Sequence, residues 1–138
     1  MSDTAFVLDP RLKADTQPVI ALPLCDVLLM NDARYAWLIL VPRVASCTEV
    51  LDLPEAERAQ LWQEINHVAA ALRETVPCDK LNIGALGNIV RQLHVHVIAR
   101  KEGDAAWPGP VWGNGTPTPY DVNELQSLIR VLRPSLAA

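Results

Sequence analysis

Residues 92–99, Gln-Leu-His-Val-His-Val-Ile-Ala, constrain the fold of this chain more than any other segment. Apolar side chains occupy every second position, and successive side chains of a β-strand point to opposite faces of its sheet. The segment therefore predicts a strand with one apolar face, formed by Leu93, Val95, Val97 and Ala99. The opposite face begins with three polar side chains and ends with an apolar one: Gln92, His94, His96 and Ile98. We expect a sheet that packs against a helix on one face and carries two neighbouring imidazoles on the other.

The hydrophobic pattern of the rest of the chain predicts an α+β fold. Strands are predicted at residues 27–31, 36–42, 80–86 and 92–99, with a weaker indication at 18–23. Two amphipathic helices are predicted at residues 53–75 and 121–133. This order of strands, long helix, strands and final helix predicts an antiparallel sheet of about five strands in an α+β domain.

Acidic residues and proline mark the expected helix ends. Asp52, with Glu55 three residues later, predicts the cap of the long helix, whose apolar stripe is expected to include Trp62. Asp121 predicts the start of the last helix, and Pro134 predicts its end because proline lacks a main-chain donor.

Length, charge and cysteine content limit the class of protein. A chain of 138 residues predicts one domain that spans residues 1–138. The net charge of -4 gives no electrostatic reason to expect binding to a nucleic-acid polymer. Three widely spaced cysteines predict reduced thiols in a cytoplasmic protein. No signal peptide or long apolar run is visible, so we expect no membrane association.

Residues 107–119, WPGPVWGNGTPTP, predict an irregular segment because proline and glycine disrupt both helix and strand. Large aromatic side chains are seldom left fully in water. We therefore expect Trp107 and Trp112 to pack on the domain or on a second subunit.

The two imidazoles on one strand face allow three interpretations. A structural role is the simplest, and it is the one we give to His67 on the long helix. A metal site would need a third and usually a fourth ligand, which the cysteines and the distant Glu102 and Asp104 do not supply in an obvious pattern. The third interpretation is nucleophilic attack of one imidazole on phosphorus, with the other as a hydrogen-bond donor. Glycines in residues 84–88, GALGN, could turn main-chain N–H groups toward such a phosphate.

Residues 92–98 resemble the signature of the histidine triad (HIT) family, His-φ-His-φ-His-φ-φ with φ apolar, at every position except the first. The surrounding segments, GNIVRQLHVHVIARKEGD and VLLMNDARYAWLILVPR, are similar to the glycine turn and the earlier hairpin of that family. The resemblance covers about residues 20–112 and leaves a tail and helix at 113–138. It implies the HIT-like antiparallel fold.

The resemblance also implies catalytic roles. His94 stands at the position of the nucleophile, which forms a transient nucleotidyl-histidine. His96 stands at the last histidine, which contacts the α-phosphate and can donate a proton. Gln92 replaces the first histidine. The residue at this position orients the nucleophile through its main-chain carbonyl, which a side-chain replacement retains. We therefore expect the substitution to tune the catalysis rather than abolish it. Ile89 stands where a hydroxyl often assists, and this predicts slow turnover or a shifted leaving-group preference.

Nucleotide-binding residues follow from the same resemblance. Near the phosphate it implies Asn82, Gly87 and Asn88. At the ribose it implies Asn31 and Asp32, and beside the base Leu29 with Leu24.

The resulting expectation is a nucleotide phosphohydrolase or nucleotidyl transferase of the dinucleoside polyphosphate or nucleoside phosphoramidate type. It requires no cofactor or metal and acts on a small-molecule nucleotide as a homodimer. Two alternatives stay open. One is a nucleotide-binding protein with little or no turnover, and the other is a metal-site protein that uses His94 and His96 as ligands.

Overall fold

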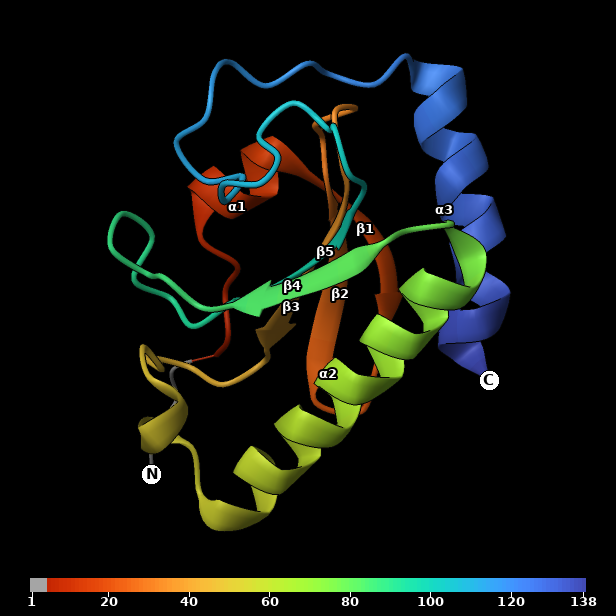
Figure 1. Ribbon diagram of the computed structural model, residues 1–138. Coiled ribbons are helices and arrows are strands. Elements are labelled where there is room, and N and C mark those ends of the chain that lie inside the picture. The colour runs from red at the N-terminus through yellow and green to blue at the C-terminus, as the bar shows by residue number, and fades with distance from the viewer. Residues whose placement is uncertain (1–4) are drawn as a thin grey trace.

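The computed structural model describes residues 5–138 and contains one five-stranded sheet with helices on its outside (Figure 1). The elements in chain order are α1 (Pro10–Asp15), β1 (Thr16–Ala21), β2 (Cys25–Met30), β3 (Ala36–Pro42), the 3₁₀ turn η1 (Val50–Asp52), α2 (Glu55–Thr75), β4 (Lys80–Gly84), β5 (Val95–Arg100) and α3 (Val122–Ala137). The strands lie in the order β1-β2-β3-β5-β4, and all neighbours are antiparallel. The predicted α+β fold is confirmed.

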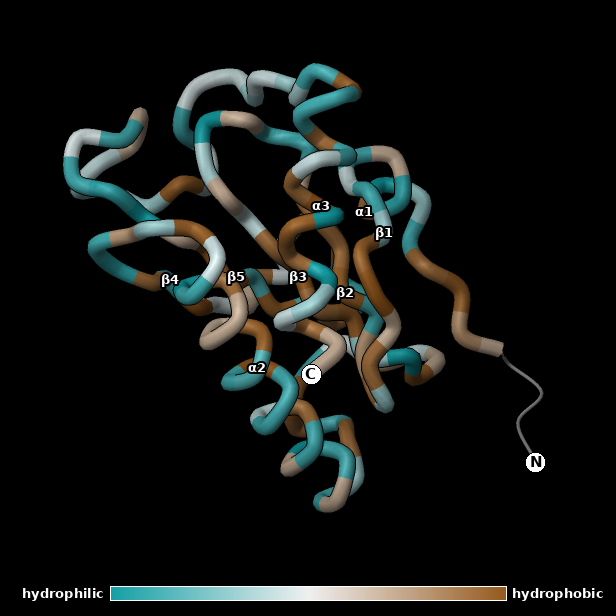
Figure 2. The backbone as a smooth tube through the Cα atoms, turned by 90° about the vertical axis from the view of Figure 1, so that its right-hand side faces the viewer, coloured by the Kyte–Doolittle hydropathy of each residue, from teal (hydrophilic) through white to brown (hydrophobic). Residues whose placement is uncertain are grey.

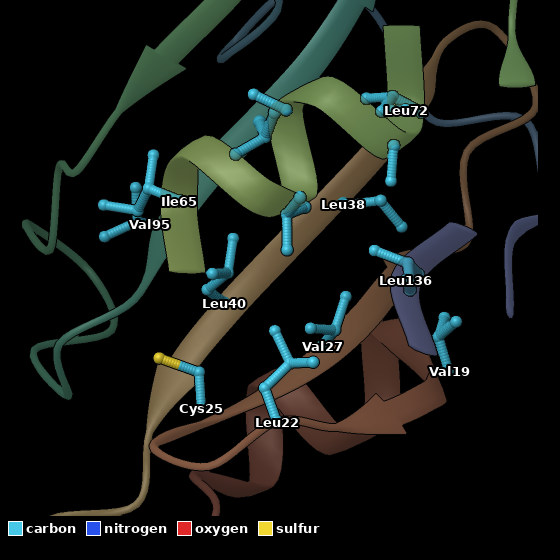
Figure 3. Close-up of a cluster of buried hydrophobic side chains, with 14 of the residues drawn as sticks. Val19, Leu22, Cys25, Val27, Leu38, Leu40, Ile65, Leu72, Val95 and Leu136 are labelled. Atoms are coloured by element: carbon cyan, nitrogen blue, oxygen red, sulfur yellow. The ribbon is translucent and has the colours of Figure 1, made fainter. Parts of the chain in front are cut away.

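One face of the sheet is covered by α2 and α3. Leu38 and Leu40 of β3 point toward Ile65 and Leu72 of α2, and Leu136 of α3 closes the same cluster (Figure 3). The apolar face predicted for the histidine strand lies here: Leu93, Val95, Val97 and Ala99. We call this cluster the helix-side core. In Figure 2 the strands run brown through the centre, while α2 alternates brown and teal, as expected of a helix with one buried face.

The other face of the sheet is covered by segments from distant parts of the chain. Trp37 and Ile39 of β3 and Ile98 of β5 lie on this face, together with Leu12 of α1 and Val111 of the late irregular segment. Figure 1 shows α1 beside that segment. We call this cluster the histidine-side core because His96 pairs with Ile39 on the same face.

Several helix ends differ from the prediction. The N-cap of α2 is Pro54, while the Asp52 carboxylate accepts hydrogen bonds from the main chain of Thr48 and Glu49 and so caps η1 instead. Helix α3 starts at its predicted cap Asp121 but continues through Pro134 to Ala137. It continues because the next turn buries Leu136 in the helix-side core.

Three further differences concern Trp62, helix α1 and the start of β5. Trp62 is 53% exposed, because it lies outside the buried stripe of α2, which includes Leu61 and Ile65. Helix α1 was not predicted, although Asp9 caps it and Pro10 opens it, as many helices begin. Strand β5 begins at Val95 rather than residue 92, since the amide of Leu93 donates to the Cys47 carbonyl outside the ladder.

Over residues 5–138, no helix has the length and apolar character to cross a membrane.

Candidate active site

His94 immediately precedes β5, and its ring is held by the main chain. Its Nδ1 lies 2.7 Å from the carbonyl oxygen of Gln92. A carbonyl can only accept, so Nδ1 donates in this contact, and in the neutral ring Nε2 keeps its lone pair. The structure therefore leaves His94 with a free basic nitrogen of the kind that a nucleophile requires.

His96 lies one strand position further along the same face. The indole Nε1 of Trp37 donates a hydrogen bond of 3.0 Å to Nδ1 of His96, so Nε2 carries the proton of the neutral ring. The ring centroids of His94 and His96 are 4.9 Å apart, and the planes meet at 68°. The strand alternation has thus brought the two imidazoles together, as predicted.

The neighbourhood of His96 keeps its ring neutral. Burial, and next the proximity of His94, lower the pKa of His96 from 6.5 to about 3. A proton on Nδ1 would also face the Trp37 N–H, which would place two donors against each other. The neutral ring of His96 can therefore donate only through Nε2, a form that suits contact with an anionic oxygen.

Gly84 makes room for an aromatic cover over His96. Gly84 of β4 pairs with His96 of β5, and a Cβ at Gly84 would lie 3.3 Å from the Trp112 ring. The ring of Trp112 lies edge-on to His96 with centroids 5.2 Å apart. Trp112 thus packs on the domain, which is one of the two predicted alternatives. His94 and His96 are 7% and 5% exposed, so little of either ring faces solvent.

The turn between β4 and the histidines lies at the surface. Gly87 has a φ of 72°, in the left-handed region that favours glycine. Asn88 is exposed and Ile89 is 79% exposed, while Val90 packs against the histidine-side core. The phosphate contacts expected of Gly87 and Asn88 stay a prediction.

Asn82 takes part in a different contact from the one expected. It pairs with Ile98, on the histidine side of the sheet, but its Oδ1 accepts from Arg100 at 2.8 Å. Arg100 is 1% exposed and forms two hydrogen bonds, of 2.7 and 2.8 Å, to the carboxylate of Asp104. Because Asp104 also accepts from the Trp107 amide, this cluster anchors the segment that leads to Trp112. A phosphate contact of Asn82 stays a prediction.

The residues expected at the ribose already have partners. Asp32 is 1% exposed, binds the Arg34 guanidinium with both oxygens and accepts from the Thr118 amide. Burial acts to raise the pKa of Asp32, but the Arg34 and Thr118 hydrogen bonds hold it below its ordinary value. Asn31 accepts from the amide of Tyr120. Ribose binding by Asn31 and Asp32 stays a prediction, and it would require some of these bonds to open.

The apolar residues expected beside the base lie on the helix side of the sheet. Leu29 is fully buried in the helix-side core, and Leu24 packs against the same cluster. Leu28, the preceding residue, belongs to the histidine-side core and pairs with Ile39. Leu29 therefore lies on the face opposite the histidines, because alternation alone does not say which face of β2 is which, and its contact with a base stays a prediction.

His67 and the metal interpretation can be placed as well. His67 Nε2 lies 2.7 Å from the Leu136 carbonyl and ties α2 to α3, which is a structural role. Within residues 5–138, no group of three or more His, Cys, Asp or Glu side chains is arranged to hold a metal ion. Two cavities, of about 250 and 480 Å³, are lined by residues other than His94 and His96.

Sequence reasoning missed two contributors to the site. Trp37 is the hydrogen-bond partner of His96, and the alternation of β3 indicated its face but not its partner. The second is the N-terminal arm, which we define as residues 5–9. Its only sequence signal was the Asp9-Pro10 helix start that follows it.

The comparisons with known proteins agree with this geometry. The sequence model of the HIT domain matches residues 11–103. A histidine triad protein from Bradyrhizobium japonicum is 53% identical, with a TM-score of 0.94 over 96% of this chain and 99% of its own. One from Sinorhizobium meliloti is 51% identical, with a TM-score of 0.92 over 94% and 96%.

A histidine triad protein from Marinobacter aquaeolei is 45% identical, with a TM-score of 0.95 over 97% of this chain and 98% of its own. A comparison with curated protein sequences finds no match. The HIT domain match covers well over half of the chain, and the solved structures cover nearly all of it. The chain belongs to the histidine triad (HIT) family.

Proposed function

We propose that this protein is a nucleotide phosphohydrolase or nucleotidyl transferase that acts at the α-phosphate through His94. The observation that carries the proposal is the bond from His94 Nδ1 to the Gln92 carbonyl, which in the neutral ring places the lone pair on Nε2. In the first step the Nε2 lone pair attacks the α-phosphorus, and the bond from phosphorus to the leaving group breaks. Water or another acceptor then attacks the nucleotidyl-histidine, releases a nucleoside monophosphate or its transfer product, and returns the imidazole.

His96 supports this chemistry as a neutral donor. Its Nε2–H is available because Trp37 occupies Nδ1. A donor placed where negative charge develops stabilises the transition state and contributes typically a few kcal/mol. The imidazole of His94 is itself the nucleophile, so the proposed chemistry needs no resident cofactor or metal.

Family membership suggests two substrate classes, dinucleoside polyphosphates and nucleoside phosphoramidates. Gln92 stands at the first position of the triad signature in this proposal, which makes the protein a two-histidine variant. Its main-chain carbonyl performs the orienting role, and a side-chain replacement leaves that atom in place.

The test is incubation of the protein with adenosine phosphoramidate and with a dinucleoside tetraphosphate, followed by chromatography of the products. We expect the wild type to release adenosine monophosphate and His94→Ala to release none above background. His67→Gln is the matched control, because it removes a histidine that lies between α2 and α3. Equal product from wild type and His94→Ala would contradict the proposal.

A nucleotide-binding protein with little turnover is the second candidate. It is favoured by the small exposure of His94 and His96, 7% and 5%, and by the exposed Ile89 at a position where a hydroxyl often assists. Calorimetry with adenosine monophosphate, together with mass spectrometry of acid-quenched mixtures, separates the two. Tight binding without a covalent adduct on His94 would favour the binding protein.

We also propose a homodimer. Strand β4 ends the sheet, and in the described part of the chain it pairs only with β5. Ile83 and Leu86 beside this edge are 46% and 45% exposed, and Trp62 on α2 is 53% exposed. Open strand edges with apolar neighbours favour pairing with another chain. Sedimentation of the wild type and Ile83→Lys tests this, with a shift toward the monomer expected for the variant.

A further inference from the structure

The side chain of Gln92 is bound to the N-terminal arm. Its Oε1 accepts from the amide of Asp9 at 2.8 Å, and its Nε2 donates to the carbonyl of Val7 at 2.8 Å. The two contacts join residues that are more than 80 positions apart in sequence. A primary amide presents a donor and an acceptor side by side, so it matches an amide and a carbonyl of an extended main chain.

Little else in the arm can hold it so specifically. Phe6 and Leu8 pack partly against the histidine-side core, whereas Val7 between them is 74% exposed. Apolar contact is non-directional and does not fix where the main chain lies. The Gln92 amide therefore supplies the directional part of the docking.

The arm leads into α1, whose Arg11 contacts the turn between β4 and the histidines. Asp9 caps α1, and the Arg11 guanidinium bonds both the Asp9 carboxylate and the carbonyl of Ile89, the latter at 3.1 Å. The pKa of Asp9 lies below its ordinary value because the Arg11 side chain and amide bond its carboxylate. The arm thus brings a carboxylate and a guanidinium to the border of the histidine site.

Gln92 contacts both the N-terminal arm and His94, the proposed nucleophile. The side chain of Gln92 holds the arm, while its main-chain carbonyl holds Nδ1 of His94. We propose that Gln92 is a positioning residue, which docks the N-terminal arm as a wall of the active site and thereby fixes the carbonyl that orients His94. The docking stands by itself, and its kinetic consequence rests on the proposed function.

The chemistry of position 92 is specific to an amide. A glutamate can accept from Asp9 but, when ionised, cannot donate to Val7. An imidazole has one donor and one acceptor, but its two nitrogens point in divergent directions and do not match neighbouring main-chain groups. Replacement by either residue would leave at least one main-chain group of the arm without its partner.

Two sets of variants test the proposal. Gln92→Met keeps the length of the side chain and removes both hydrogen bonds, and Gln92→Glu removes the donor alone. On the arm, Asp9→Pro removes the amide hydrogen at a residue whose φ of -54° suits proline. Asp9→Ala is its matched control, because it also loses the helix cap but keeps the amide that bonds Gln92.

The first readouts need no substrate. Exchange of the Asp9 amide should become about fivefold faster in Gln92→Met, because a hydrogen bond of about 1 kcal/mol is lost. In Asp9→Ala the amide of residue 9 should exchange more slowly than in Gln92→Met, because its bond to Gln92 remains. Asp9→Pro has no amide at residue 9, so its effect is measured on the His94 ring, where it should act in the same direction as Gln92→Met. Nitrogen NMR of the His94 ring should show that Gln92→Met loses part of the Nδ1-protonated tautomer. Unchanged exchange and an unchanged tautomer in Gln92→Met would overturn the proposal.

The kinetic readout separates this proposal from the proposed function. With a dinucleoside tetraphosphate, kcat should fall about tenfold in Gln92→Met and less in Gln92→Glu, with a smaller change in KM. If the wild type releases no product, but Gln92→Met changes the amide exchange of the arm and the tautomer of His94, the proposed function fails and the docking role stands. If the wild type is active and Gln92→Met matches it in kcat, exchange and tautomer, the docking role fails alone.

Discussion

Trp37 and His96 form a hydrogen bond of 3.0 Å between the indole N–H and the imidazole Nδ1, across the β3–β5 pair. The bond selects one tautomer of the ring, since the indole nitrogen can only donate. It also opposes protonation of His96, because the incoming proton would meet another donor. A residue remote from the signature in sequence thus sets the chemical state of its last histidine.

Trp37→Phe should lower kcat about fivefold. The variant keeps an aromatic ring but removes the donor, so His96 divides between two tautomers and presents Nε2–H for only part of the time. The loss of one hydrogen bond of about 1 kcal/mol corresponds to about a factor of five in rate. Steady-state kinetics with the preferred nucleotide measure the effect, and wild-type kcat would show that the bond does not matter for turnover. Trp62→Phe on α2 is the control, because that tryptophan is exposed.

Stability should fall as the pH is lowered below 6.5, because of His96. In the unfolded chain its pKa is 6.5, and in the folded protein burial lowers the pKa of His96 to about 3. Between these values the unfolded state binds one more proton, so the free energy of unfolding decreases by about 1.4 kcal/mol per pH unit. Above pH 6.5 this contribution is fully present.

Urea unfolding of the wild type and of His96→Gln, between pH 6.5 and about 5, checks this expectation. That range avoids the acid titration of Asp9, Asp32 and Asp104, whose pKa values are all held below the ordinary 3.8. The variant should show a shallower decline than the wild type. Parallel curves would contradict the assignment.

Removal of the aromatic cover should raise the pKa of His96. Burial is the main cause of its low pKa, and Trp112 lies edge-on to the ring at 5.2 Å. Trp112→Ala would admit water and make the charged form less costly. Proton NMR titration of the His96 ring measures the shift, and Trp62→Ala should leave the pKa of His96 where it is. An unchanged value in Trp112→Ala would show that other residues provide the burial.

Glu64→Ala should cost about 3 kcal/mol of unfolding free energy. Glu64 of α2 is 4% exposed, and its carboxylate accepts from the amides of Leu24 and Cys25 and from Gln60. Removal of the carboxylate leaves main-chain donors without partners, and hydrogen bonds to a charged group are worth about 1.5–3 kcal/mol. Urea unfolding at neutral pH measures the loss. Gln63→Ala, an exposed neighbour, should stay within about 0.5 kcal/mol of the wild type.

Much of the fold could be predicted because it follows from local pattern. Alternation in residues 92–99 assigned each side chain to the correct face, since the period of two is a property of the strand itself. The long helix was predicted for a similar reason. Alternation could not say which face of β2 meets the histidines, and so Leu29 was chosen where Leu28 lies on that face.

Contacts between distant segments could not be predicted in the same way. Trp37 with His96, Gly84 with Trp112 and Asp32 with Thr118 each depend on strand order or on the course of an irregular segment. Local periodicity predicts neither the strand order nor the course of that segment. Pro134 shows that tertiary packing can outweigh a local signal. Proline usually ends a helix, but the burial of Leu136 extends α3 past it.

The contact between Gln92 and the arm involves only main-chain atoms of Val7 and Asp9. Such a bond is indifferent to the side chains on the arm, apart from proline at the donor position. Substitutions in residues 5–9 can therefore leave this contact in place, even where they alter the packing of Phe6 and Leu8 or the helix cap at Asp9. Among relatives, a glutamine at the position of Gln92 should predict a docked arm better than sequence similarity within the arm does.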